Sequence, residues 1–169
     1  MALIVAGRGT MPHTPDVITR KTLIALLNED LSREFQAVIA YVVYSQTLKG
    51  AQYMAIAKEL EAHAGQELQH ALTIAKQIDY LGGTPTTVPR EVKMSTEAQA
   101  MLQFDLDAEG ETIVNYRERI GQCEALGEYA IAEEIRAIVR VEQEHQIDLA
   151  TALNKDVPVL IAKKSHGRR

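Results

Sequence analysis

The sequence predicts an all-α protein, an antiparallel four-helix bundle with a long crossover between its second and third helices. Three observations favour this fold. Among 169 residues there are only 5 prolines and 10 glycines, aromatic residues make up only 5%, and apolar residues recur at helical spacing in four long segments. An all-β fold would use more aromatic, β-branched and turn residues. The length suits one ordinary domain with a sizeable core.

The chain divides into three expected parts. Residues 1–15 form an N-terminal arm, 16–153 form the bundle and 154–169 form a C-terminal tail with a basic end. Helices are expected over roughly 16–49, 52–81, 96–126 and 128–153, because each segment is rich in good helix formers. Their apolar stripes are Leu23, Leu27, Leu31, Val38, Tyr41 and Leu48; Tyr53, Ile56, Leu60, Ala64, Ala71, Ile74 and Ile78; Leu102, Leu106, Ile113, Tyr116 and Ile120; and Ile131, Ile135, Ile138, Leu149 and Leu153.

The connections between these segments differ in length. Gly50 and Gly127 leave room only for tight turns, so the first two and the last two helices are expected to form hairpins. The stretch from Gly82 to Thr96 is 15 residues long, whereas helix connections in bundles usually need about 2–8. Fully extended, it reaches about 50 Å, and a helix of such a bundle is about 42 Å long. A crossover along the whole bundle, with the second and third helices parallel, is therefore expected.

Glutamate and histidine interrupt the apolar stripes at matching depths. They are Glu34 in the first helix, Glu67 and His70 in the second, Glu109 in the third, and Glu142 and His145 in the fourth. No Lys or Arg is expected in these stripes, and an ionised carboxylate in an apolar interior is costly without a partner. Two divalent cations would neutralise the four carboxylates, and each histidine would add one nitrogen ligand. Paired Glu-x-x-His motifs with two further glutamates are typical of di-metal four-helix bundles.

An internal repeat supports the same site. Identical residues recur 75 positions apart at five places: Asp30 and Asp105, Glu34 and Glu109, Tyr41 and Tyr116, Glu67 and Glu142, His70 and His145. Chance is a poor account of five identities among such residue types. The two helical hairpins are therefore expected to be two copies of one half-site, related by a pseudo-twofold axis.

Over roughly residues 17–153 the sequence resembles bacterioferritins and, more broadly, the ferritin-like di-iron proteins. The matching stretches are Glu34-Phe35-Gln36-Ala37 with Tyr41, Glu67-Leu68-Gln69-His70, Asp105-Leu106-Asp107-Ala108-Glu109, and Glu142-Gln143-Glu144-His145. The resemblance implies two iron ions per subunit, with Glu34 and Glu109 as terminal ligands, Glu67 and Glu142 as bridges, and His70 and His145 as caps. Tyr41 and Tyr116 would donate hydrogen bonds or an electron to the centre, with simple core packing as the alternative.

Two departures from the family pattern concern haem and assembly. Bacterioferritins carry haem on a methionine directly after the glutamate of the second helix, and this position is Leu68 here, so no haem is expected. The familiar ferritin cage also uses a fifth short helix, which Pro158 and the basic end of the tail disfavour. A homo-oligomer with a dimer as its smallest unit is expected, and assembly into a cage remains an alternative.

Three further kinds of residue near the site are assigned supporting roles. Asp30 and Asp105 are expected to accept a hydrogen bond from the outer ring nitrogen of a ligand histidine, with an ordinary partly exposed aspartate as the alternative. His63, one turn before Glu67, is expected to support the site or face solvent, with a secondary iron site as the alternative. Cys123 is expected to be a small buried apolar residue.

Carboxylate ligands with one imidazole per metal suit Fe(II) or Mn(II). The expected function is that of a ferroxidase, an oxidoreductase that oxidises Fe(II) with O2 or H2O2 for iron storage or detoxification. Two alternatives stay open: a peroxidase-like or catalase-like peroxide scavenger with two Fe or Mn ions, and a DNA-associated protective protein. The formal net charge of −5 disfavours nucleic-acid binding, so DNA contact by the basic tail is not expected.

The sequence also predicts a cytoplasmic protein without membrane contact. A single cysteine cannot form an internal disulfide, which fits a reducing compartment. The short apolar run Ala2–Ala6 has no basic residue before it, unlike a signal peptide. No run approaches the roughly 20 apolar residues of a membrane-spanning helix.

Overall fold

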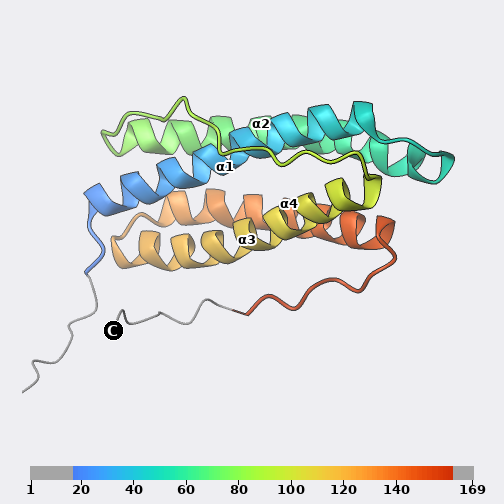
Figure 1. Ribbon diagram of the computed structural model, residues 1–169. Coiled ribbons are helices and arrows are strands. Elements are labelled where there is room, and N and C mark those ends of the chain that lie inside the picture. The colour runs from blue at the N-terminus through green and yellow to red at the C-terminus, as the bar shows by residue number, and fades with distance from the viewer. Residues whose placement is uncertain (1–16, 162–169) are drawn as a thin grey trace, which may run out of the picture.

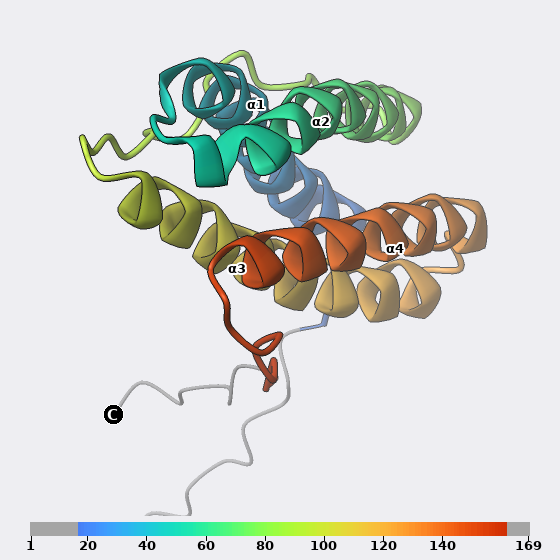
Figure 2. The same ribbon diagram turned by 90° about the vertical axis from the view of Figure 1, so that its right-hand side faces the viewer.

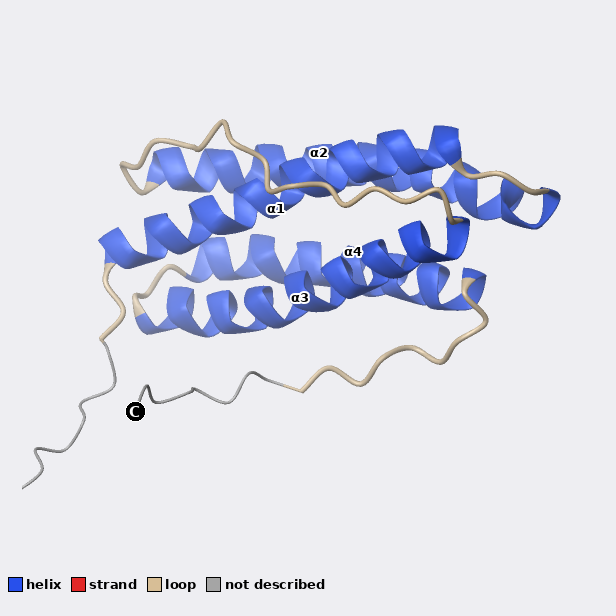
Figure 3. Ribbon diagram, in the orientation of Figure 1, coloured by secondary structure: helices blue, strands red, loops and turns tan. Residues whose placement is uncertain are grey.

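The computed structural model describes residues 17–161, which form four long helices (Figure 1). Helix α1 spans Arg20–Thr47, α2 spans Met54–Tyr80, α3 spans Ala98–Ala125 and α4 spans Tyr129–Ala152. A short 3-10 turn, η1, covers Ala51–Tyr53 ahead of α2. Within the described range there is no strand (Figure 3), so the all-α prediction and its four helical segments are confirmed.

The helices pack as two hairpin layers, α1 with α2 and α3 with α4, which lie one above the other in Figure 2. Helix α1 also packs on α3, and α2 on α4. Local sequence sets the helix ends. Thr19 caps α1, accepting a hydrogen bond from the Thr22 backbone N–H at 3.1 Å. Gly127 adopts a positive φ of 76°, which lets the Glu128 N–H turn back to the Cys123 carbonyl at 2.9 Å and close α3.

The segment between α2 and α3 follows α1 along most of its length. Asn28 donates to the Thr84 carbonyl at 3.2 Å, Ser32 to the Val88 carbonyl at 2.8 Å and Gln36 to the Glu91 carbonyl at 2.6 Å. Further along α1, the Tyr44 hydroxyl donates to the Lys93 carbonyl. These hydrogen bonds are spaced one or two helical turns apart, so they hold the crossover against α1. It makes α2 and α3 run in the same direction (Figure 1), as predicted.

The core consists of two apolar clusters separated by a polar layer. One cluster gathers Leu23, Leu27, Leu31, Ala71, Ile74, Ile78, Leu81, Tyr116, Cys123, Ile131, Ala132, Ile135 and Ile138. The other gathers Ala40, Tyr41, Tyr44, Ile56, Leu60, Ala64, Met101, Leu102, Leu106, Leu149 and Ala150. Burying a large apolar side chain stabilises the fold by about 1.5–3 kcal/mol. The clusters hold the helices together on both sides of the layer where the predicted ligands lie.

After α4 the described chain turns back along the bundle without forming another helix (Figure 1). Leu160 packs over α3 where Gly110 stands, and a methyl group at Gly110 would lie 3.2 Å from Leu160 Cδ2. The expected N-terminal arm, 1–15, and the basic end, Lys163–Arg169, lie outside the described residues. Across residues 17–161, none of the helices has the length and apolar character needed to cross a membrane.

Candidate metal centre

The six predicted ligands meet in one buried layer in the middle of the bundle. Glu34 comes from α1, Glu67 and His70 from α2, Glu109 from α3, and Glu142 and His145 from α4. All six are buried, and the most exposed of them, His70, has a relative exposure of 6%. The repeat of one half-site in each hairpin brings them to the same depth.

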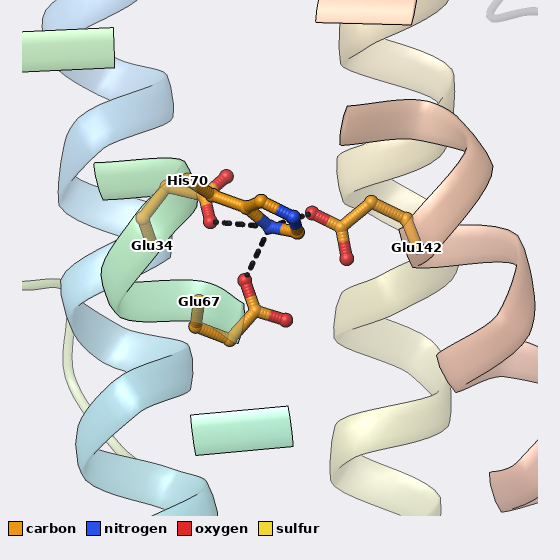
Figure 4. A group of neighbouring side chains, drawn as sticks. All are labelled: Glu34, Glu67, His70 and Glu142. Atoms are coloured by element: carbon orange, nitrogen blue, oxygen red, sulfur yellow. Dashed lines mark hydrogen bonds and ion pairs between the residues drawn. The ribbon is translucent and has the colours of Figure 1, made fainter. Parts of the chain in front are cut away.

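Three carboxylates surround the ring of His70 (Figure 4). Its Nδ1 lies 3.0 Å from Glu67 Oε2, 3.2 Å from Glu142 Oε1 and 3.5 Å from Glu34 Oε2. These groups come from α1, α2 and α4, so the cluster forms only when the two hairpins pack together.

His145 has the matching surroundings. Its Nδ1 lies 2.9 Å from Glu67 Oε1, 3.3 Å from Glu142 Oε2 and 3.7 Å from Glu109 Oε1. Glu67 and Glu142 therefore each turn one oxygen toward His70 and the other toward His145. Glu34 and Glu109 each approach only one of the two histidines. The centre thus consists of two similar subsites that share two carboxylates.

The donor set fits a pair of metal ions. Buried atoms without a hydrogen-bond partner include Glu34 Oε2, Glu67 Oε1, both carboxylate oxygens of Glu142 and His145 Nδ1. Two ligand atoms bound about 2.1 Å from one ion at a right angle lie about 3.0 Å apart, close to the shorter distances seen in both subsites. Within residues 17–161 the ion pairs of the four glutamates are all with His70 and His145. With no Lys or Arg of the described residues paired to these glutamates, the two clusters could hold a pair of cations.

Without metal, the centre retains protons. Burial and the charges of Glu142 and Glu34 raise the pKa of Glu67 well above its usual range. Burial, with the charge of Glu142, raises the pKa of Glu109 to about 7. Burial alone would lower the pKa of His145, but the carboxylates of Glu109, Glu142 and Glu67 outweigh it and raise that pKa to about 12. Because a ligand histidine must be neutral and a ligand glutamate ionised, metal binding has to release protons.

Two tyrosines hold the outer carboxylates. Tyr41 on α1 donates a hydrogen bond to Glu109 Oε1, and Tyr116 on α3 donates to Glu34 Oε1. The hydrogen bonds expected of these residues are therefore present. Burial is the main cause that raises the pKa of both hydroxyls, so both remain protonated donors at neutral pH.

The expected role of Asp30 is wrong. Its carboxylate pairs with Arg119 at 2.6 Å and with Arg33 at 2.8 Å, and both arginines are buried. The expectation that the inward stripes lack arginine also fails, because these long side chains reach Asp30 from α3 and α1. The outer nitrogen of His145, Nε2, lies 2.7 Å from Gln66 Oε1 instead.

Asp105 also departs from its expected role. Its Oδ2 is buried without a hydrogen-bond partner, and burial raises the pKa of Asp105 well above its usual range. The repeat has no arginine near it, because Ala108 and Tyr44 occupy the positions equivalent to Arg33 and Arg119. The sequence analysis did not predict the contacts of Arg33 and Arg119 with Asp30, or of Gln66 with His145. The only sequence signal for them is a polar residue next to an apolar stripe.

A cavity of about 470 Å³ connects the centre with the surface between α1, α3 and the crossover. Small residues on the facing helices, Ala37, Ala40 and Ala108, line it, and all four site glutamates border it. Arg90 and Lys93 of the crossover also line it. The sequence analysis did not predict this opening. Its only sequence signal is the set of small alanine side chains on α1 and α3, which leave space between the two helices. The cavity forms an opening from the surface toward the buried carboxylates.

A family model described as the ferritin-like domain matches residues 24–157, nearly the whole described bundle. The chain belongs to the ferritin-like family. Among curated relatives, the bacterioferritin of Desulfovibrio desulfuricans is 28% identical over 124 residues, covering 73% of this chain and 69% of that protein. The bacterioferritin of Brucella melitensis is 26% identical over 161 residues, 94% of each chain.

Solved structures agree with this ferritin-like assignment. A ferritin-like di-iron-carboxylate protein from Bacillus anthracis superposes with a TM-score of 0.77 at 34% identity, covering 80% of this chain and 97% of that one. A dodecameric thioferritin from Bacteroides fragilis has a TM-score of 0.74 at 26% identity, with 82% and 88% covered. The D. desulfuricans bacterioferritin, whose structure describes a di-iron site, also has a TM-score of 0.74 at 26% identity, with 80% of each chain covered.

Proposed function

We propose that this ferritin-like protein is a ferroxidase that oxidises Fe(II) with O2 or H2O2, for iron storage or detoxification. The observation that carries the proposal is the sharing of Glu67 and Glu142 between two subsites, each with its own histidine. Two ions held in this way would be close enough to react with one oxidant molecule. Bacterioferritins among the relatives support the same activity.

In this proposal, the iron ligands are Glu34, Glu67, His70, Glu109, Glu142 and His145. Glu34 and Glu109 would each hold one ion, and Glu67 and Glu142 would be shared by the two ions. Each bound Fe(II) supplies one electron to the oxidant. Mn(II) suits the same donors, since both ions accept carboxylate and imidazole ligands.

The protein itself supplies charge compensation, orientation and access. Four carboxylates match the charge of two divalent ions in a layer closed by apolar clusters on both sides. Tyr41 and Tyr116 orient the terminal carboxylates through their hydrogen bonds, and Tyr41 is also proposed as an electron donor to the centre. Gln66 orients the ring of His145. The cavity beside α1 and α3 admits Fe(II) and the small oxidant.

We also propose that the protein acts as a cytoplasmic homo-oligomer without haem. The Bacteroides fragilis neighbour, described as dodecameric, supports assembly. Large apolar side chains remain exposed on the α1–α2 hairpin of the single chain: Ile39, Val42, Leu68 and Leu72. Burying them against a second copy would remove apolar surface from water. Leu68 cannot ligate haem iron at the position where bacterioferritins use methionine.

The ferroxidase proposal is tested by Glu67→Ala and Glu142→Ala. Each removes a carboxylate shared by both subsites, so stopped-flow Fe(II) oxidation should slow by about 100-fold or more. Glu61→Ala is the matched control, because Glu61 lies on the same helix but faces solvent beside Lys58. Wild-type rates in both test variants would overturn the site assignment.

A second candidate is peroxide removal by a di-metal centre, because the same donor set suits Mn(II) as well as Fe(II). Consumption of H2O2 without net iron oxidation or retention would favour it over iron storage. Salt-sensitive DNA binding that disappears on deletion of Lys163–Arg169 would instead favour a DNA-associated protective role.

A further inference from the structure

A third group of ligand-type side chains lies beside the centre, on the face formed by α2 and α4. Glu59 and His63 come from α2 and Asp148 from α4, and one ligand atom of each lies within 4.8 Å of those of the others. His63 Nε2 lies 3.3 Å from Asp148 Oδ2. Glu59 is exposed and the Asp148 side chain is 44% exposed, so the group opens to solvent.

His63 is the buried member of this group, and one of its two ring nitrogens lacks a partner within residues 17–161. Its relative exposure is 3%, and its Nδ1 has no hydrogen-bond partner. The equivalent position 75 residues further along the repeat is Ile138, an ordinary core residue. A buried polar atom without a partner costs about 1–3 kcal/mol. An apolar side chain would avoid this cost, whereas the imidazole places Nε2, a nitrogen able to bind a metal ion, 3.3 Å from the Asp148 carboxylate.

The ring of His63 also lies directly behind the centre. It stacks on the ring of His145, with centroids 4.0 Å apart, and meets the edge of the Tyr41 ring at 5.3 Å. His145 is a proposed iron ligand, so the third group is one ring away from the iron site. The cavity, by contrast, borders α1, α3 and the crossover. The centre therefore has the cavity on its α1–α3 side and the third group of ligand-type side chains on its α2–α4 side.

We propose that Glu59, His63 and Asp148 bind one divalent transition-metal ion, as a holding site between the α2–α4 face and the centre. Two carboxylates and one imidazole form a donor set of the kind that Fe(II), Mn(II) and Zn(II) accept. The exposed side leaves the remaining positions to water. The role of the site in holding iron rests on the proposed ferroxidase function, but binding of the ion does not.

Zn²⁺ is the probe, because it binds such donors without redox chemistry. Calorimetric titration of the wild-type protein, with zinc located by anomalous diffraction, should show ions in all three groups. The double variant Glu59→Gln/Asp148→Asn should lose the third ion and keep the other two. Both changes are at surface positions, so the fold is retained. Glu61→Gln, the same change of charge two residues along α2, should keep all three.

The Glu67→Ala/Glu142→Ala variant separates the two proposals. It should retain one Zn²⁺, at His63, and adding His63→Ala should remove that ion. No zinc at His63 in either background would overturn the holding site. Zinc at His63 together with an empty centre in the wild-type protein would overturn the ferroxidase site and leave the third site standing.

Discussion

The Tyr116 hydroxyl on α3 donates a hydrogen bond to Glu34 Oε1 on α1, across the boundary between the two helical hairpins. The other oxygen of Glu34, Oε2, lies 3.5 Å from His70 Nδ1. Tyr41 makes the equivalent bond from α1 to Glu109 on α3. Each hairpin therefore orients the outer carboxylate of the other, and neither half-site is complete alone.

Tyr116→Phe and Tyr41→Phe should each slow Fe(II) oxidation by about tenfold, because a ligand loses its orienting partner while the ring still packs. Each should also lower the free energy of unfolding by about 1 kcal/mol. Stopped-flow absorbance and urea unfolding measure the two effects. Tyr129→Phe, at a side chain that is 67% exposed, is the control and should change neither. If both test variants oxidised Fe(II) at the wild-type rate, the tyrosines would have no role in the activity of the centre.

Arg119→Met should destabilise the metal-free and metal-bound protein equally, by about 3–5 kcal/mol. The variant leaves the buried Asp30 carboxylate without its closest counter-charge. Adding Asp30→Asn should restore part of the loss, because no charge then remains buried. Urea unfolding checks both, and Arg117→Met, at an exposed position on the same helix, is the matched control. A loss seen only with metal bound would mean that Arg119 acts on the centre instead.

Metal should stabilise the fold more at about pH 7.5 than at about pH 5.5. The pKa of Glu109 is raised to about 7 and that of His145 to about 12, so the metal-free folded state binds more protons than the unfolded chain in this range. Its stability therefore falls as the pH rises from 5.5 to 7.5. Over the same range fewer protons compete with the cations for the ligands.

The measurement is the rise in melting temperature on adding Zn²⁺ at the two pH values. Glu67→Ala/Glu142→Ala should show a small rise that differs little between them, because the shared ligands are gone. A larger rise at the lower pH in the wild-type protein would contradict the assigned protonation.

Asn28→Ala should loosen the crossover at its first anchor. The amide of Asn28 donates to the Thr84 carbonyl at 3.2 Å and accepts from the Thr86 N–H at 2.6 Å. Losing both bonds should cost about 1–3 kcal/mol and raise the hydrogen-exchange rate around Thr86. Exchange measured by mass spectrometry checks this, and rates equal to wild type at Thr86 would show that the other anchors suffice.

Helical periodicity and the repeat were enough to predict the four helices, the crossover and the six residues of the central layer. Each of these depends on spacing along one chain segment, and a glutamate three residues after a buried leucine, as Glu34 is after Leu31, lies on the same helix face. The partner of Asp30 could not be predicted in this way. Arg119 lies 89 positions further along the chain, and its side chain could equally have extended into solvent.

The sequence by itself determined which side chains converge in this protein, because periodicity places them inward. Four inward carboxylates, with no Lys or Arg expected in their stripes, then predicted a pair of cations. Only the tertiary structure decided how they divide into subsites, with one oxygen of Glu67 toward His70 and the other toward His145. The same holds for the stack of His63 on His145 and for the cavity beside the crossover. Side-chain torsions and contacts between distant helices set these features, and the pattern of residues along a single helix does not contain them.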